Sequence, residues 1–156
     1  MDAVRRQHQR DAYAAFLSGL NAYAYATDWE RCLTQARQDL AEAEGGASSA
    51  HYHPGAADPG AKQVRSAAGS LLRPLRPTLD VVSLEGPGYV ADLADQAYRA
   101  ALAMGSASSA ASVLGPLWVP LPDHDPNETH RRLLECIAAF TAAARDYLNG
   151  ESQRQR

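Results

Sequence analysis

The histidines are the first candidates for metal chemistry in this sequence of 156 residues. His51 and His53 flank a tyrosine, and His124 stands between two aspartates. Imidazole nitrogens and carboxylate oxygens are common ligands of divalent metals. Alternate histidines in an extended segment, however, point to opposite sides unless the chain turns. The sequence favours exposed loop histidines and leaves a metal site of His51, His53 and His124 as the other interpretation.

Three tyrosines, Tyr13, Tyr23 and Tyr25, fall within one predicted helix. Their rings can line a pocket for a flat apolar ligand, which the hydroxyl groups would orient. Tyrosines more often lie at the edge of a core, with the ring buried and the hydroxyl in water. A ligand pocket is therefore the alternative to a structural role.

An apolar segment rich in proline covers residues 114–123. Proline favours extended backbone of the polyproline type, and such segments bind grooves on partner proteins. Exposure of so much apolar surface to water is unfavourable, so we favour a segment that folds over the end of the helical core. An exposed interaction segment is the alternative, and it would use Leu117, Trp118, Val119 and Leu121.

The sequence carries none of the short motifs that bind phosphates or dinucleotides or that assemble a metalloprotease or serine hydrolase site. The Glu-x-x-His pattern of di-metal helical bundles is missing too. We therefore expect a protein that is not an enzyme and that uses no cofactor.

Charge and hydropathy restrict the partners. The net charge is −3, with an isoelectric point of about 5.9, whereas duplex-binding domains usually present a basic face. No run of about 18 apolar residues would span a membrane. The polar N-terminus lacks the apolar region of a secretory signal. We expect a cytoplasmic protein with reduced Cys32 and Cys136, no nucleic-acid partner and no membrane span.

Four amphipathic helical stretches would position these residues. The first covers residues 3–44, and its apolar stripe moves to nearly the opposite side after Thr27. Thr27 with Glu30 has the form of a capping box, so we favour a break or kink there over an unbroken helix. The two stripes are Tyr13, Phe16, Leu17, Leu20 and Tyr23 before the change, and Trp29, Leu33, Ala36, Leu40 and Ala43 after it.

The second stretch follows a Gly-, Ser- and Pro-rich linker, predicted to be mobile, at about residues 45–60. Pro74 and Pro77 interrupt it, although its apolar stripe keeps its phase through both. Each proline removes a backbone donor and disfavours helical geometry at the residue before it, Arg73 or Arg76. We predict a kinked helix or two short helices in line.

Turn signals mark the predicted ends of the other helices. Asp-Pro pairs at 58–59 and 125–126 each predict an N-cap followed by proline at the first helical position. The turn at 86–88, Gly-Pro-Gly, makes the second and third stretches antiparallel neighbours. The last helix is predicted to end at Gly150, before a polar tail at 151–156. The last two stripes are Val90, Leu93, Ala94, Ala97, Ala101 and Met104, and Leu133, Ile137, Phe140, Ala144, Tyr147 and Leu148.

These patterns predict an all-α four-helix bundle as a single domain at residues 1–150. Residues 5–17 open with arginines and an Ala-Tyr-x-x-Phe pattern, and residues 81–90 contain a Leu-Glu-Gly-Pro turn. In these two segments the chain resembles uncharacterised small all-helical proteins of high-GC actinobacteria. The resemblance implies a helical architecture and no particular activity.

The sequence thus predicts a non-catalytic helical interaction or regulatory module. It would act through protein–protein contacts, with a protein partner or with a second copy of itself. The reasons are the lack of a convergent polar site and the two opposed apolar stripes of the first stretch, which one small bundle does not easily cover. A small-molecule-binding bundle that uses the tyrosines is the alternative, and a loop metal site comes third.

Overall fold

The computed structural model describes residues 2–43, 58–113 and 125–153, and these ranges consist of helices joined by short turns, without a strand. The predicted all-α class is therefore confirmed. The described ranges contain six α-helices where four were predicted for the chain, because the first two stretches are each divided. The elements are α1 (Asp2–Ala26), α2 (Trp29–Ala43), α3 (Pro59–Ala67), the 3-10 helix η1 (Ala68–Leu72), α4 (Leu75–Glu85), α5 (Gly88–Val113) and α6 (Pro126–Gln153).

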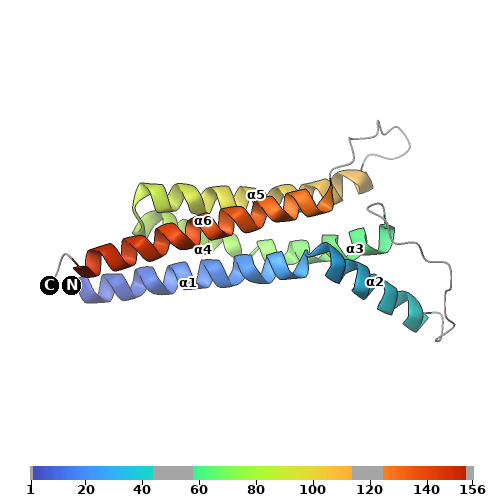
Figure 1. Ribbon diagram of the computed structural model, residues 1–156, viewed down its shortest axis with the longest axis horizontal. Helices are drawn as coiled ribbons and strands as arrows, with labels where there is room; N and C mark the ends of the chain where they lie inside the picture. Colours follow the sequence, from blue (N-terminus) through green and yellow to red (C-terminus); the bar gives the residue numbers. More distant parts are fainter. Residues whose placement is uncertain (1, 44–57, 114–124, 154–156) are drawn as a thin grey trace.

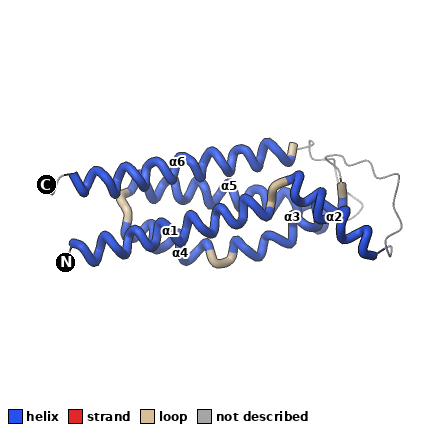
Figure 2. Tube along the Cα trace, turned by 60° about the horizontal axis from the view of Figure 1, so that its bottom comes forward, coloured by secondary structure: helices blue, strands red, loops and turns tan. Residues whose placement is uncertain are grey.

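Four of the helices, α1, α4, α5 and α6, run side by side along the length of the molecule (Figures 1 and 2). We call these helices together with η1 the main body. Helices α2 and α3 pack against each other at one end, and we call them the α2–α3 pair. The start of α1 and the end of α6 lie together at the opposite end.

The core of the main body is built from the predicted stripes. Phe140 of α6 lies at its centre, with its ring edge-on to Tyr13 at 6.0 Å and to Phe16 at 5.4 Å between centroids. Such aromatic pairs stabilise a core beyond the area they bury. The largest fully buried side chains around them are Tyr23, Leu20, Leu75, Leu133, Val82 and Val90.

The first stretch divides after α1, at Thr27, as favoured from the sequence. The predicted capping box of Thr27 and Glu30 is wrong by one residue. The Asp28 carboxylate accepts the Arg31 backbone N–H at 3.0 Å, which caps the start of α2. Thr27 is buried instead, and its hydroxyl donates to the Tyr23 carbonyl at 2.8 Å, so it closes the end of α1.

The second stretch changes from α-helix to 3-10 helix after Ala67 and divides at Pro74, and α3, η1 and α4 follow one another in a line (Figure 1). Pro77 lies in the first turn of α4, where a missing N–H leaves no helical hydrogen bond unmade. The predicted departure of Arg73 and Arg76 from helical geometry is not found. Arg73 keeps φ −58° and ψ −47°, and Arg76 lies within α4. Buried leucines on either side of Pro74 hold this backbone and outweigh the local steric preference.

The last helix begins as predicted and ends later. At the start of α6 the Asp125 carboxylate accepts the Asn127 N–H at 2.9 Å. Gly150 does not end the helix, which continues to Gln153. Glycine ends a helix most effectively when its backbone is left-handed, and Gly150 has no such conformation. The helix therefore ends three residues later than predicted.

Candidate functional site

The three predicted ligand-binding tyrosines are not brought together. Tyr13 and Tyr23 are buried in the core of the main body, whereas Tyr25 is 64% exposed. The Tyr23 hydroxyl donates to the Ala101 carbonyl at 3.0 Å, and burial raises the pKa of Tyr23 to about 12. Tyr25 carries the Arg31 guanidinium over its ring, 4.0 Å from the centroid. Two of these tyrosines therefore act as core residues, and the third lies on the surface.

The other predicted site residues lie outside the described part of the chain. This applies to the candidate metal ligands His51, His53 and His124 and to the apolar segment at 114–123 with Leu117, Trp118, Val119 and Leu121. Within the described ranges, no three His, Cys, Asp or Glu side chains are grouped so that they could hold a metal ion. These two hypotheses stay predictions.

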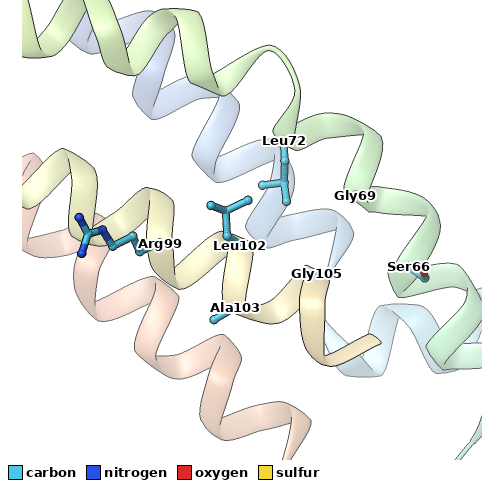
Figure 3. A pocket seen from close by; sticks show the side chains of 7 residues that line it. All are labelled: Ser66, Gly69, Leu72, Arg99, Leu102, Ala103 and Gly105. Carbon is cyan, nitrogen blue, oxygen red and sulfur yellow. The ribbon is translucent and has the colours of Figure 1, made fainter. Parts of the chain in front are cut away.

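A hollow of about 530 Å³ opens between α3–η1 and α5 (Figure 3), and we call it the α5 groove. The side chains of Leu72 and Leu102 extend toward each other across it, while Arg99 points along α5. Arg99 is paired there with Asp95 at 2.7 Å. One wall of the groove consists of Ser66, Gly69 and Leu72, and the other of Arg99, Leu102, Ala103 and Gly105.

Two glycines create this hollow. A Cβ atom added to Gly69 would meet nothing within 4 Å, so this position faces open space. A Cβ atom on Gly105 would lie 3.5 Å from Leu72 Cδ1, at ordinary contact distance. Glycine on each wall thus removes the side chains that would otherwise fill the gap between the helices. Leu102 remains 42% exposed beside them.

A second group of polar side chains surrounds the junction of α1 and α2. His130 of α6 places Nε2 2.9 Å from the Ala24 carbonyl, near the end of α1 where helical carbonyls lack partners. The Cys32 thiol donates to the Ala26 carbonyl at 3.5 Å. These contacts satisfy backbone groups that the break exposes, so their role is to hold the junction closed. Cys136, the other cysteine, is also free.

The buried titratable side chains at this junction, Cys32 and Arg65, are not activated for catalysis. Burial raises the pKa of the Cys32 thiol, which keeps it protonated and weakly nucleophilic. Burial also lowers the pKa of Arg65, whose guanidinium lies 5.6 Å from the centre of the Trp29 ring. The nearby Cys32, Tyr23 and Asp28 oppose that lowering. The junction therefore offers packing and cation–π contact and no activated nucleophile.

The sequence interpretation missed the α5 groove. The sequence patterns assigned no role to Gly69 or Gly105. The available signal was a glycine inside each of two neighbouring amphipathic stretches, since such glycines often mark a close approach or an open surface.

Comparisons with known proteins do not identify the chain. No protein-family model matches it, and neither the curated proteins nor the solved structures provide a match. Among the described residues, no helix has the length and apolar character needed to cross a membrane.

Proposed function

We propose that this chain is a non-catalytic helical interaction module, and that it binds a partner protein in the α5 groove. The observation that carries the proposal is the groove itself, which is open, lined mainly by small and apolar residues and bordered by the half-exposed Leu102. Grooves between helices are common binding sites for segments of other proteins.

The two opposed apolar stripes of residues 3–44 are weaker evidence for a binding partner than the sequence suggested. Trp29 and Leu33 of α2 are buried against Ala61 and Val64 of α3, so the chain covers this stripe itself. Only its far end, with Leu40 38% exposed, remains in water. The α5 groove is therefore the better candidate for the contact with a partner.

Site-specific photo-crosslinking tests the proposal with a matched pair of leucines. Leu102 in the groove is 42% exposed and Leu134 on α6, which does not line the groove, is 45% exposed. A photoreactive phenylalanine derivative replaces either leucine in the full chain, expressed in its source cells. We expect a discrete protein adduct from position 102 and none from position 134.

The Gly69→Leu variant, which fills the groove, should abolish the adduct from position 102. An adduct of twice the chain's mass would identify a second copy as the partner. Equal labelling at both positions, no adduct at position 102, or an adduct that persists in Gly69→Leu would overturn the proposal.

A further inference from the structure

We infer that α2 is an arm that two copies of this chain exchange. In the dimer, α2 continues straight from α1 and packs on α3 of the second copy. The inference is independent of the α5 groove. It is carried by the packing of α2, by the contacts across the break before it, and by the apolar stripes of α1 and α2.

Helix α2 packs mainly against α3, whereas α3 also packs against α5 and η1 of the main body. The contact buries the first turns of α2, with Trp29 and Leu33 packed near Ala61 of α3. Residues 37–43 of α2 are all exposed, and this part of the helix extends away from the main body (Figure 1). Departure of α2 would therefore leave α3 in place and uncover one small apolar surface.

The break between α1 and α2 is short. Only Thr27 and Asp28 separate the two helices. Residues 20–43 contain no Gly or Pro, the two residue types that most disfavour a helix interior. The cap at the start of α2, from the Arg31 N–H to the Asp28 carboxylate, is one hydrogen bond that favours the break. A continuous helix over residues 2–43 is therefore compatible with the local sequence.

Two contacts across the break exist only in the bent arrangement. The Cys32 thiol donates to the Ala26 carbonyl at 3.5 Å, and the Arg31 guanidinium lies over the Tyr25 ring, 4.0 Å from its centroid. In each pair the residues are six positions apart, and such residues lie on different faces of a straight α-helix. A straight helix would lose both contacts, each of which is weak.

His130 of α6 supports the bend from outside. Its Nε2 atom lies 2.9 Å from the Ala24 carbonyl, and it donates the hydrogen bond because a carbonyl oxygen only accepts. In a continuous helix this carbonyl would accept the Asp28 N–H. The bent form is thus held by a few single contacts around the break, while the larger α2–α3 contact is not specific to it.

A straight helix cannot keep α2 on its own α3. Wound as one helix, the stripe of α1 with Phe16 and Leu20 and the stripe of α2 with Trp29 and Leu33 lie on nearly opposite sides. Since Phe16 and Leu20 are in the core of the main body, the stripe of α2 would face away from it. The α3 helix of a second copy fits this stripe, because the same contact is made within one chain. Mutual exchange retains all buried contacts of the pair.

The connection between α2 and α3 is long enough for the exchange. Residues 44–57 lie between the described ends of the two segments. These 14 residues span up to about 46 Å when extended. Helix α2, with 15 residues, is about 22 Å long. The chain can therefore reach its own α3 after α2 has moved onto the second copy.

A designed disulfide distinguishes this exchange from any other dimer. A Cβ atom on Gly60 would lie 3.1 Å from the Ala36 Cβ, near the separation found in disulfides. The full chain with Ala36→Cys and Gly60→Cys, and with Cys32→Ala and Cys136→Ala, is refolded at millimolar concentration, oxidised, and separated into monomer and dimer. We expect chains of the dimer fraction to run as a covalent dimer on a non-reducing gel, and chains of the monomer fraction as a monomer.

Two substitutions at the break test its role. Asp28→Ala removes the cap and favours a continuous helix, whereas Asp28→Gly also lacks the carboxylate but retains a usable cap and disfavours a helix interior. We expect Asp28→Ala to dimerise about 100-fold more tightly than Asp28→Gly, about tenfold for each of the two breaks, measured by analytical ultracentrifugation. Asp125→Ala, which removes the corresponding cap of α6, should not change dimerisation.

Three outcomes would overturn the inference. A dimer fraction that runs as a monomer on the non-reducing gel would show association through another surface. The absence of a dimer of Asp28→Ala at millimolar concentration, or equal dimer affinities of Asp28→Ala and Asp28→Gly, would show that α2 does not exchange. Circular dichroism verifies that each variant remains helical. The crosslink from position 102 does not depend on any of these results.

Discussion

The main body has a much larger buried apolar core than the α2–α3 pair. The main body surrounds Phe140 with buried side chains from all of its helices. The pair has a separate small apolar cluster whose buried members are Trp29, Cys32, Leu33 and Ala61. The two regions are joined at the break after α1, at Thr27, and at the change from α-helix to 3-10 helix after Ala67.

This difference shows how one amphipathic stretch can serve two cores. The apolar stripe on α1 faces the other helices of the main body, and the apolar stripe on α2 faces α3. The change of face after Thr27 therefore corresponds to a change of packing partner. Regions with few buried contacts open at lower free energy than the global core. The comparison therefore predicts that damage to the main body unfolds the chain, whereas damage to the pair stays local.

Truncation of the central ring should have the largest effect. Phe140→Ala removes a fully buried ring and its edge contacts with Tyr13 and Phe16, and should lower the free energy of unfolding by about 3–5 kcal/mol. Urea denaturation followed by circular dichroism measures this. Leu134→Ala on the same helix, where the leucine is exposed, should change stability by less than about 0.5 kcal/mol. Similar losses in both variants would contradict the assignment of the core.

Truncation of the largest side chain in the pair should act locally. Trp29→Ala removes the centre of the small cluster and its contact with Arg65, and should destabilise the α2–α3 pair by about 3 kcal/mol. Amide hydrogen exchange should accelerate in α2 and α3 and remain unchanged in the middle of α5 and α6. A uniform acceleration along the chain would show that the two regions unfold as one unit.

Alkaline pH should weaken the main body through Tyr23. Burial raises its pKa from 10.0 to about 12, so the unfolded chain ionises this phenol before the folded chain does. The stabilisation is complete below pH 10 and is lost as the pH rises toward 12, by about 2 kcal/mol.

Tyr23→Phe is the control for this titration. It loses the hydrogen bond to the Ala101 carbonyl, by about 1 kcal/mol near neutral pH. Its stability should then decrease less steeply than that of the wild type between pH 10 and 12. Parallel pH profiles of the two proteins would exclude Tyr23 as the titrating group.

The smallest effect is expected at the cap of α2. Asp28→Ala removes the acceptor of the Arg31 N–H and should destabilise the pair by about 1 kcal/mol, whereas Asp28→Asn should retain most of the cap. Glu30→Ala should have a smaller effect, because Glu30 contributes only through its charge near the helix start. If Glu30→Ala accelerated hydrogen exchange of α2 as much as Asp28→Ala does, the capping box of Thr27 and Glu30 would be supported after all.

Much of the fold could be predicted because its signals are local. The stripe from Val90 to Met104 and the stripe from Leu133 to Ala144 are buried as their spacing predicted. The Asp58 carboxylate accepts the Ala61 N–H at 2.7 Å, so the Asp-Pro start of α3 is confirmed as well. Periodicity and capping depend on residues within one or two turns, which the sequence lists in order.

The candidate site could not be predicted in the same way. The groove exists because Leu72 of η1 meets Gly105 of α5, and these residues are brought together only when the chain folds back at the turn before α5. The difference in burial between the tyrosines also depends on tertiary contacts. Tyr23 is buried because α5 supplies a carbonyl for its hydroxyl, while Tyr25, two residues on, faces solvent.

The sequence by itself determined that the chain is helical, where its helices begin and which faces are apolar, because these properties follow from short-range spacing. Tertiary structure decided how far helical geometry continues around Pro74 and where two glycines leave the surface open. Each of these depends on contacts between segments far apart in the chain, whose free energies exceed the local preferences of the backbone.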